Sequence, residues 1–193
     1  MALLGEEVVE EWLNRQGYFT IRGVKIGVDE IDLLAIRPTP EGTLERRHIE
    51  VQVSMRPISY ICDVPKKQQR EGRPRNSAKR SEEELLVGVR EWVEKKFSRP
   101  RKTALLQRLA PGTWSSELVL HNVKSEGEVD LIRNCGVRIH RLTSIVHDLR
   151  DQSLIIQSAS GSNLLELIHF SSTMGDRKID DATADLIANK TGK

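Results

Sequence analysis

Two acidic strand-like segments, residues 28–35 and 48–53, flank a turn-like stretch centred on Glu41 and constrain the fold more than any other feature. An antiparallel hairpin about that point places Asp32 directly opposite Glu50. Directly opposed residues have Cβ atoms roughly 4.5 to 5.5 Å apart, a distance at which like charges repel each other. Something is therefore expected to compensate this repulsion, and a divalent cation is the obvious candidate.

Side chains alternate between the two faces of a strand, so the hairpin separates its residues into two sets. One face is predicted to carry the polar residues Glu30, Asp32, His48, Glu50 and Gln52. The opposite face is predicted to be apolar and to carry Ile31, Leu33, Ala35, Ile49, Val51 and Val53. The alternative interpretation of the polar set is a solvated strand face with carboxylates that serve solubility, and for His48 we consider substrate contact as well as a surface or core position.

The length of 193 residues and the hydrophobic content of 38% predict one domain over residues 1–150, followed by a C-terminal extension over 151–193 that ends in a polar tail. A net charge of +2 does not by itself indicate a polyanionic partner. No stretch approaches the roughly 20 apolar residues of a membrane helix, and the N-terminus has no secretory pattern. We therefore expect a cytoplasmic protein without a membrane partner, with Cys62 and Cys135 reduced.

The apolar periodicity alternates between helical and strand-like along the chain, which predicts an α/β sandwich with a mixed sheet flanked by helices. Trp12, Trp92 and Phe97 lie at helical core spacing and are predicted to pack inside. The expected order is a helix at 4–16, strands at 18–26, 28–37 and 44–54, a long loop at 57–80, helices at 81–97 and 103–109, a strand at 116–123, a helix at 127–134, a strand at 137–141 and a helix at 143–150. In the extension we expect an edge strand at 154–157 and a helix at 163–170.

The loop over residues 57–80 is basic and contains three prolines. Such a loop is either a solvated flexible segment or a source of cations that neutralise the phosphates of a bound strand. The second interpretation predicts these nucleic-acid-binding residues, the first of them from the strand expected at 18–26: Lys25, Lys66, Lys67, Arg70, Arg73, Arg75, Lys79 and Arg80.

The N-terminal helix, the acidic hairpin and the following helix and strands together resemble the PD-(D/E)XK nuclease superfamily. That superfamily has a restriction-endonuclease-like αβββαβ core, with an acidic residue on the first helix, an Asp on the second strand and Glu-x-Lys on the third. The likeness is closest to Holliday-junction-resolvase-like members and extends over residues 4–54, where the matching motifs read Gly5-Glu6, Leu13-Asn-Arg-Gln-Gly17-Tyr18 and Glu30-Ile-Asp32-Leu33.

The resemblance implies that Asp32, Glu50 and the backbone carbonyl of Val51 bind Mg²⁺ or Mn²⁺, with Glu6 as a further carboxylate. Glu7 and Glu10 compete with Glu6 for that role, because acidic residues in a first helical turn are favoured by the helix dipole regardless of function. Hard oxygen ligands of this kind suit these cations, which activate water for attack on a phosphodiester.

Position 52 departs from the superfamily pattern, because Gln52 replaces the usual lysine. An amide orients a water or phosphate but supplies no positive charge. Lys25 or a lysine of the basic loop is a possible substitute. Our first hypothesis is a metal-dependent DNA endonuclease for branched or structured substrates, with a homodimer possible. The alternatives are an inactive nucleic-acid-binding module on the same scaffold, and a subunit that acts only with a partner.

Overall fold

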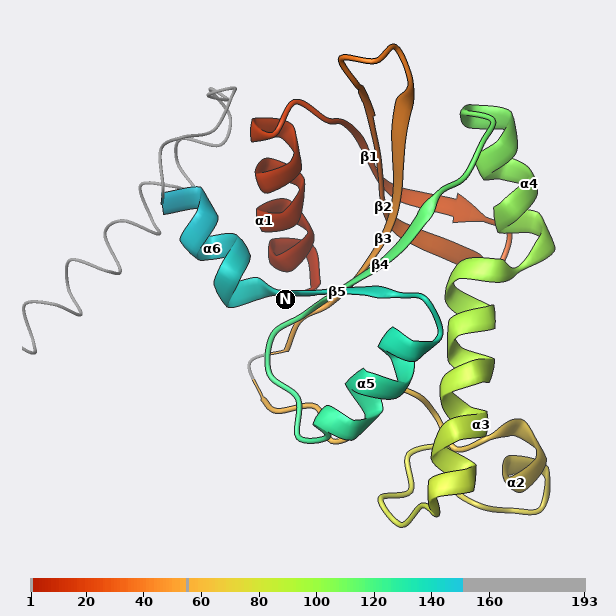
Figure 1. The fold of residues 1–193 in the computed structure, drawn as a ribbon. Coiled ribbons are helices and arrows are strands. Elements are labelled where there is room, and N and C mark those ends of the chain that lie inside the picture. Colours follow the sequence, from red (N-terminus) through yellow and green to blue (C-terminus); the bar gives the residue numbers. More distant parts are fainter. Residues whose placement is uncertain (1, 55, 151–193) are drawn as a thin grey trace, which may run out of the picture.

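A computed structural model describes residues 2–54 and 56–150, and it shows an α/β fold in which helices flank a five-stranded mixed sheet of order β1-β2-β3-β4-β5 (Figure 1). The first three strands are antiparallel, whereas β3, β4 and β5 run parallel. The elements are α1 (Ala2–Arg15), β1 (Phe19–Ile26), β2 (Asp29–Pro38), β3 (Leu44–Gln52), α2 (Lys66–Arg70), α3 (Glu82–Val93), the π-helix η1 (Glu94–Ser98), α4 (Pro100–Leu109), β4 (Ser115–Leu120), α5 (Glu126–Asn134), β5 (Arg138–Arg141) and α6 (Leu142–Arg150).

The predicted α/β fold class and the order of elements up to residue 150 are confirmed. Two details differ from the expectation. The basic loop contains the short helix α2, and the helix expected over 81–97 changes to π geometry at Glu94. The strand and helix expected at 154–157 and 163–170, and the polar tail, lie outside the described residues. Within the described ranges, no helix combines the length and apolar content needed to cross a bilayer.

The β2–β3 hairpin has the register expected for a turn centred on Glu41. Leu33 pairs with Ile49, and the pairing continues to Pro38 opposite Leu44. At the open end of the hairpin the next contact is a side-chain bond, because the Val51 amide donates to Oδ2 of Asp32 at 2.8 Å. The Asp32 carboxylate is therefore fixed against β3 at the point where the ladder of paired residues ends.

Helices cover both faces of the sheet. On one face α1 and α6 pack over a core that includes Leu33, Ile49 and Val119. On the other face α3, η1 and α5 pack over a second core that includes Leu118 and Leu120, and α4 packs beside it. Figure 1 shows the two groups of helices on opposite sides of the strands. Trp12, Trp92 and Phe97 are buried in these cores, as predicted.

The predicted alternation of β2 is wrong at Ile31. Its side chain packs with Leu34 and with Leu106 of α4, instead of sharing the cluster of Leu33. The ends of β1 and β2 bend toward α4 (Figure 1), and this bend lets residues of unlike parity contact the same helix. The polar face is also not solvated as a whole, because His48 and Glu50 are buried beneath the second group of helices.

Two contacts fix the segment that follows β3 and leads into the basic loop. Glu128, at the start of α5, accepts the amides of Ile61 and Cys62, each at 2.8 Å. Gly88 of α3 lies so close to this segment that an added Cβ would be 2.7 Å from the carbonyl oxygen of Asp63. The segment is thus held between α3 and α5 directly beside the end of β3.

Candidate functional site

Glu50 is the buried centre of the candidate site. Its side chain is 1% exposed and contacts three partners. The Lys96 ammonium donates to Oε2 at 2.5 Å, whereas Lys102 and the Nε2 of His48 contact Oε1 at 3.1 and 3.2 Å. Burial acts to raise the pKa of Glu50, but the His48 hydrogen bond and the two ammonium groups outweigh it and hold this pKa below its ordinary value. Glu50 is therefore ionised, and a solvated strand face does not describe it.

His48 supports Glu50 and is shielded from solvent. Burial lowers the pKa of the imidazole, so the ring is neutral near pH 7 and its Nε2–H donates to Glu50. The ring also packs edge-on against Phe97, with centroids 4.9 Å apart. His48 is 1% exposed and packs within the core, which agrees with its interpretation as a core residue.

Lys102 joins three elements around Glu50. The Lys102 residue is 1% exposed. Its ammonium donates to the carbonyl of Glu30 at 2.6 Å, to that of Lys96 at 2.8 Å and to the Glu50 carboxylate at 3.1 Å. These acceptors belong to β2, η1 and β3. A buried ammonium needs such full satisfaction, because an unpaired charge in the interior is costly. Lys102 therefore fixes the backbone of η1 against the two acidic strands.

The π-helix η1 determines where Lys96 points. A π-turn inserts an extra residue into a helix and occurs frequently at functional sites. Here Lys96 reaches Glu50 while the following Phe97 is buried in the core. The Lys96 side chain remains 31% exposed, so its ammonium is accessible from solvent as well as paired.

The repulsion that the sequence predicted between Asp32 and Glu50 is seen in the pKa of Asp32. Desolvation and the charge of Glu50 raise the pKa of Asp32 to about 6, while the Val51 amide and the Lys96 ammonium oppose that rise. Lys96 therefore compensates part of the repulsion between the two carboxylates, for which the sequence had favoured a divalent cation. The remaining repulsion disfavours the ionised form of Asp32, and an added cation at this carboxylate would relieve it.

A pocket of about 440 Å³ opens at these residues, which we call the acid pocket. It brings together four of the predicted catalytic and metal-binding residues, namely Asp32, Glu50, Val51 and Gln52. The remaining wall comes from the segment after β3, from α3, from η1 and from β4. Its lining is Asp32, Glu50, Val51, Gln52, Tyr60, Ile61, Asp63, Arg75, Trp92, Lys95, Lys96 and Leu118.

Glu6 lies near the acid pocket without lining it. Burial raises the pKa of its carboxyl; Arg22 opposes this rise, and the charges of Glu30 and Glu50 add to it. The competing residues Glu7 and Glu10 instead contact Arg22 of β1, at 3.3 and 3.5 Å. In the described part of the chain, no three or more His, Cys, Asp or Glu residues are grouped closely enough to hold a metal ion.

The predicted nucleic-acid-binding residues fall into three groups. Arg75 lines the acid pocket, and Lys66 lines a neighbouring pocket. Arg73 and Arg80 shape the loop, because Arg73 pairs with Glu84 and Arg80 donates to the Cys62 carbonyl. The exposed remainder line neither pocket: Lys25, Lys67, Arg70 and Lys79.

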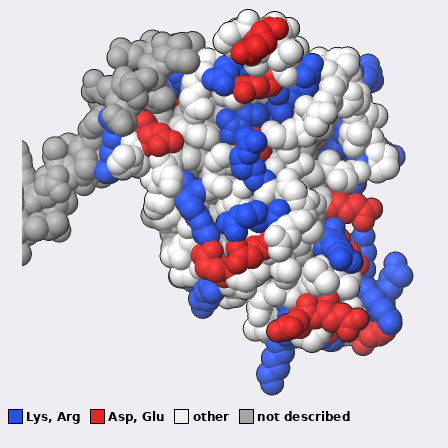
Figure 2. All heavy atoms as spheres, in the orientation of Figure 1, with Lys and Arg blue, Asp and Glu red and all other residues white. Residues whose placement is uncertain are grey.

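Charge alone does not mark a binding face on the visible surface. Figure 2 shows basic and acidic side chains interspersed over the face that it presents. This distribution agrees with the small net charge of +2. On this face, the distribution of charge alone therefore does not indicate a binding site.

Sequence reasoning missed Lys96 and Lys102. Both had a weak signal, since each falls on an apolar helical stripe: Lys96 follows Val89 and Trp92 at helical spacing, and Lys102 precedes Leu106 by four residues. A lysine on such a stripe is directed toward the protein interior. It then requires a buried acidic partner, and Glu50 is that partner for both lysines.

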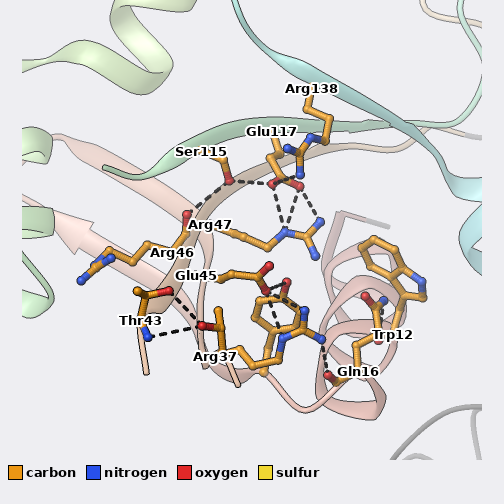
Figure 3. A network of polar contacts seen from close by, with 12 residues as sticks. Trp12, Gln16, Arg37, Thr43, Glu45, Arg46, Arg47, Ser115, Glu117 and Arg138 are labelled. Atoms are coloured by element: carbon orange, nitrogen blue, oxygen red, sulfur yellow. Dashed lines mark hydrogen bonds and ion pairs between the residues drawn. The ribbon is translucent and has the colours of Figure 1, made fainter. Parts of the chain in front are cut away.

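A second buried polar network lies on the opposite face of the sheet (Figure 3). Glu117 of β4 is fully buried and accepts a two-pronged contact from Arg47, at 2.5 to 3.0 Å. Ser115 and His140 contact the same carboxylate at 2.6 and 2.7 Å. Burial acts to raise the pKa of Glu117, but hydrogen bonds from His140, Arg47 and Ser115 lower it to about 2.

Comparison with models of known protein families finds no match, and comparison with curated protein sequences finds none. A solved structure described as "Crystal Structure of Protein of Unknown Function AF1548" is similar to this chain at 13% sequence identity and a TM-score of 0.43. The similarity covers 86% of this chain and 78% of the other.

Proposed function

We propose that this protein is a metal-dependent nuclease that hydrolyses phosphodiester bonds of DNA. The observation that carries the proposal is the acid pocket, where Asp32 and Glu50 from paired strands meet a partly exposed lysine, Lys96. The raised pKa of Asp32 supports it, because perturbed carboxyl groups in a pocket are typical of functional sites. The resemblance of residues 4–54 to PD-(D/E)XK nucleases agrees with this proposal.

The donor set fits a hard divalent cation such as Mg²⁺ or Mn²⁺. Asp32 and Glu50 offer carboxylate oxygens, the Val51 carbonyl is a further candidate ligand, and the charge on Asp32 is incompletely compensated. When bound, such an ion activates water and neutralises phosphate charge. Gln52 then orients a water or a phosphate oxygen through its amide. Lys96 supplies the positive charge that Gln52 lacks.

The test is cleavage of labelled single-stranded, double-stranded and branched DNA in Mg²⁺ or Mn²⁺. Replacement of Asp32 by the isosteric amide in Asp32→Asn removes one carboxylate charge, and we expect cleavage to fall at least ~100-fold while circular dichroism shows an intact fold. Asp130→Asn is the control, because Asp130 is exposed on α5 and, within residues 2–54 and 56–150, forms an ion pair with Arg133 alone. Full metal-dependent cleavage by Asp32→Asn would contradict the proposal.

Lys96→Met tests whether Lys96 supplies the positive charge that Gln52 lacks. Loss of the ammonium leaves Glu50 free of one competitor, so we expect Mn²⁺ to bind more tightly in calorimetry while cleavage falls at least ~10-fold. Lys124→Met, at an exposed loop position, is the control for loss of one positive charge. Unchanged Mn²⁺ affinity together with unchanged cleavage would show that Lys96 has no role in metal binding or cleavage.

One observation favours a second candidate function, a binding module without activity. Glu50 is already neutralised by Lys96 and Lys102, which is how a site that no longer binds metal would be stabilised. That candidate predicts DNA binding that is indifferent to Mn²⁺, and no metal binding by either wild type or Lys96→Met. Calorimetry with Mn²⁺ in the absence of DNA therefore separates the two functions.

A further inference from the structure

A second pocket, of about 220 Å³, adjoins the acid pocket, and we call it the basic pocket. The two share part of their lining, namely Asp63, Arg75, Trp92 and Lys95. A ligand that extends out of the acid pocket past Trp92 therefore enters the basic pocket. The two depressions form one path over α3 and η1.

The basic pocket has more positive than negative groups. Four cationic side chains and two carboxylates line it: Lys66, Arg75, Lys95, Arg99, Asp63 and Glu91. Arg75 pairs with Asp63 at 2.8 Å, and Arg99 pairs with Asp29. Among the described residues, the ammonium groups of Lys66 and Lys95 form no ion pair. These two lysines are the positive charges available to a ligand.

The wall of the basic pocket is held in place before any ligand binds. Gly88 of α3 brings the helix against the Asp63 carbonyl, and the Val64 amide donates to the Arg75 carbonyl at 2.9 Å. The Glu91 carboxylate accepts the Lys66 amide at 3.0 Å, which fixes the start of α2. Such a wall positions Lys66 without the ordering cost that a flexible loop would add.

The lining favours a phosphate over a base as the ligand. Bases in single strands are recognised by stacking on exposed aromatic rings, but Trp92 is 8% exposed and offers little ring surface. Lysine ammonium groups are effective point charges for phosphate oxygens. The charge of the pocket and its position therefore both suit the backbone of a strand.

We propose that the basic pocket binds a phosphate group of the DNA strand whose scissile bond lies in the acid pocket. This inference rests on the proposed nuclease function for the identity of the strand. The phosphate is either an internal phosphodiester or a terminal phosphate, and the chemistry of recognition is the same for both. Lys66 and Lys95 contact it, and Arg75 lies between the two pockets.

The experiment measures binding without cleavage. Fluorescence anisotropy of full-length Asp32→Asn protein with labelled DNA gives the affinity over a series of salt concentrations. In this background we introduce Lys66→Ala and Lys95→Ala together and expect at least ~10-fold weaker binding at low salt. The slope of log affinity against log salt concentration should become shallower by roughly 0.7 to 0.9 for each phosphate that is no longer neutralised. Oligonucleotides with and without a 5′ or 3′ phosphate distinguish the two sources of phosphate.

The control pair, Arg90→Ala with Lys124→Ala, removes the same two charges at exposed positions outside both pockets. The proposal predicts that this pair weakens binding less than ~2-fold. Equal effects of the two pairs, or an unchanged salt slope for the pocket pair, would overturn it. A pocket-specific effect in a protein whose wild type cleaves no DNA would instead reject the nuclease function and leave the phosphate site standing.

Discussion

Two buried glutamates on neighbouring parallel strands have opposite surroundings. Glu50 on β3 and Glu117 on β4 lie on opposite faces of the sheet, with Ile49 opposite Glu117 in the register. The Glu117 carboxylate is enclosed by Arg47, Ser115 and His140 and lines neither the acid nor the basic pocket. Glu50 is held by lysines but borders the acid pocket. The comparison separates a carboxylate enclosed by its partners from one that borders a pocket.

The pKa values of Glu117 and Glu50 are both lowered, whereas that of Asp32, beside Glu50, shifts in the opposite direction. The pKa of Glu117 lies at about 2, below its ordinary 4.5, so its ionisation favours the folded state at neutral pH. The pKa of Asp32, beside Glu50, lies at about 6, above its ordinary 3.8, so its ionisation favours unfolding. The unfavourable charge therefore lies at the acid pocket.

Removal of the Glu117 partner should produce the largest loss of stability. Arg47→Ala leaves a fully buried carboxylate without its main counter-charge, and it also removes a guanidinium that packs over the rings of Trp12 and Tyr18. We expect a loss of about 3–5 kcal/mol in the free energy of unfolding by urea denaturation. The exposed pair on α5 is the control, and Arg133→Ala should cost less than about 0.5 kcal/mol. A loss below about 1 kcal/mol for Arg47→Ala would mean that Glu117 is not held as described.

Lys102→Met, beside the acid pocket, should cause a smaller loss in the free energy of unfolding than Arg47→Ala. Glu50 keeps Lys96 and His48, so its charge remains partly compensated, but the carbonyls of Glu30 and Lys96 lose their donor. We expect destabilisation of about 2–3 kcal/mol, measured by the same urea titration. Since Lys102 anchors η1, the Mn²⁺ affinity should change as well. A variant as stable as wild type with unchanged Mn²⁺ affinity would exclude this anchoring role.

The parts of the site that the sequence could predict are those set by local rules. Turn position and strand alternation predicted the register of the hairpin, and Asp32 and Glu50 line one pocket at its end, because a hairpin register depends on nearby residues. The lysines could not be predicted in the same way, since Lys96 and Lys102 contact Glu50 across 46 and 52 positions of the chain. The π geometry of η1, which aims Lys96, has no marker in the apolar pattern.

The same limit explains the network around Glu117 and the error at Ile31. Arg47 and Glu117 are 70 positions apart, and their contact depends on β4 adding in parallel beside β3. The error at Ile31 arises because a bent strand end packs against α4, which simple alternation does not describe. Local patterns therefore predicted the acidic residues, whereas the groups that balance their charge follow from tertiary structure.

Asp32→Asn should give the smallest change in stability, with the opposite sign. The folded-state pKa of about 6 exceeds the unfolded value, so the folded state binds more protons between pH 4 and 6, and wild-type stability falls as the pH rises through this window. A shift of this size corresponds to about 3 kcal/mol, which partial exposure of Asp32 reduces, so we expect the variant to gain about 1–2 kcal/mol at pH 8 and little at pH 4.

Urea titrations of wild type and Asp32→Asn at pH 4, 6 and 8 in EDTA measure this gain. Glu117 titrates near pH 2 in both proteins, so its opposite contribution cancels in the difference. Added Mn²⁺ should stabilise wild type more than the variant, because a cation at Asp32 relieves the repulsion that the substitution removes by other means. A stability difference that does not vary with pH would show that Asp32 carries no unfavourable charge, and the contrast between the two faces of the sheet would then rest on Glu117 alone.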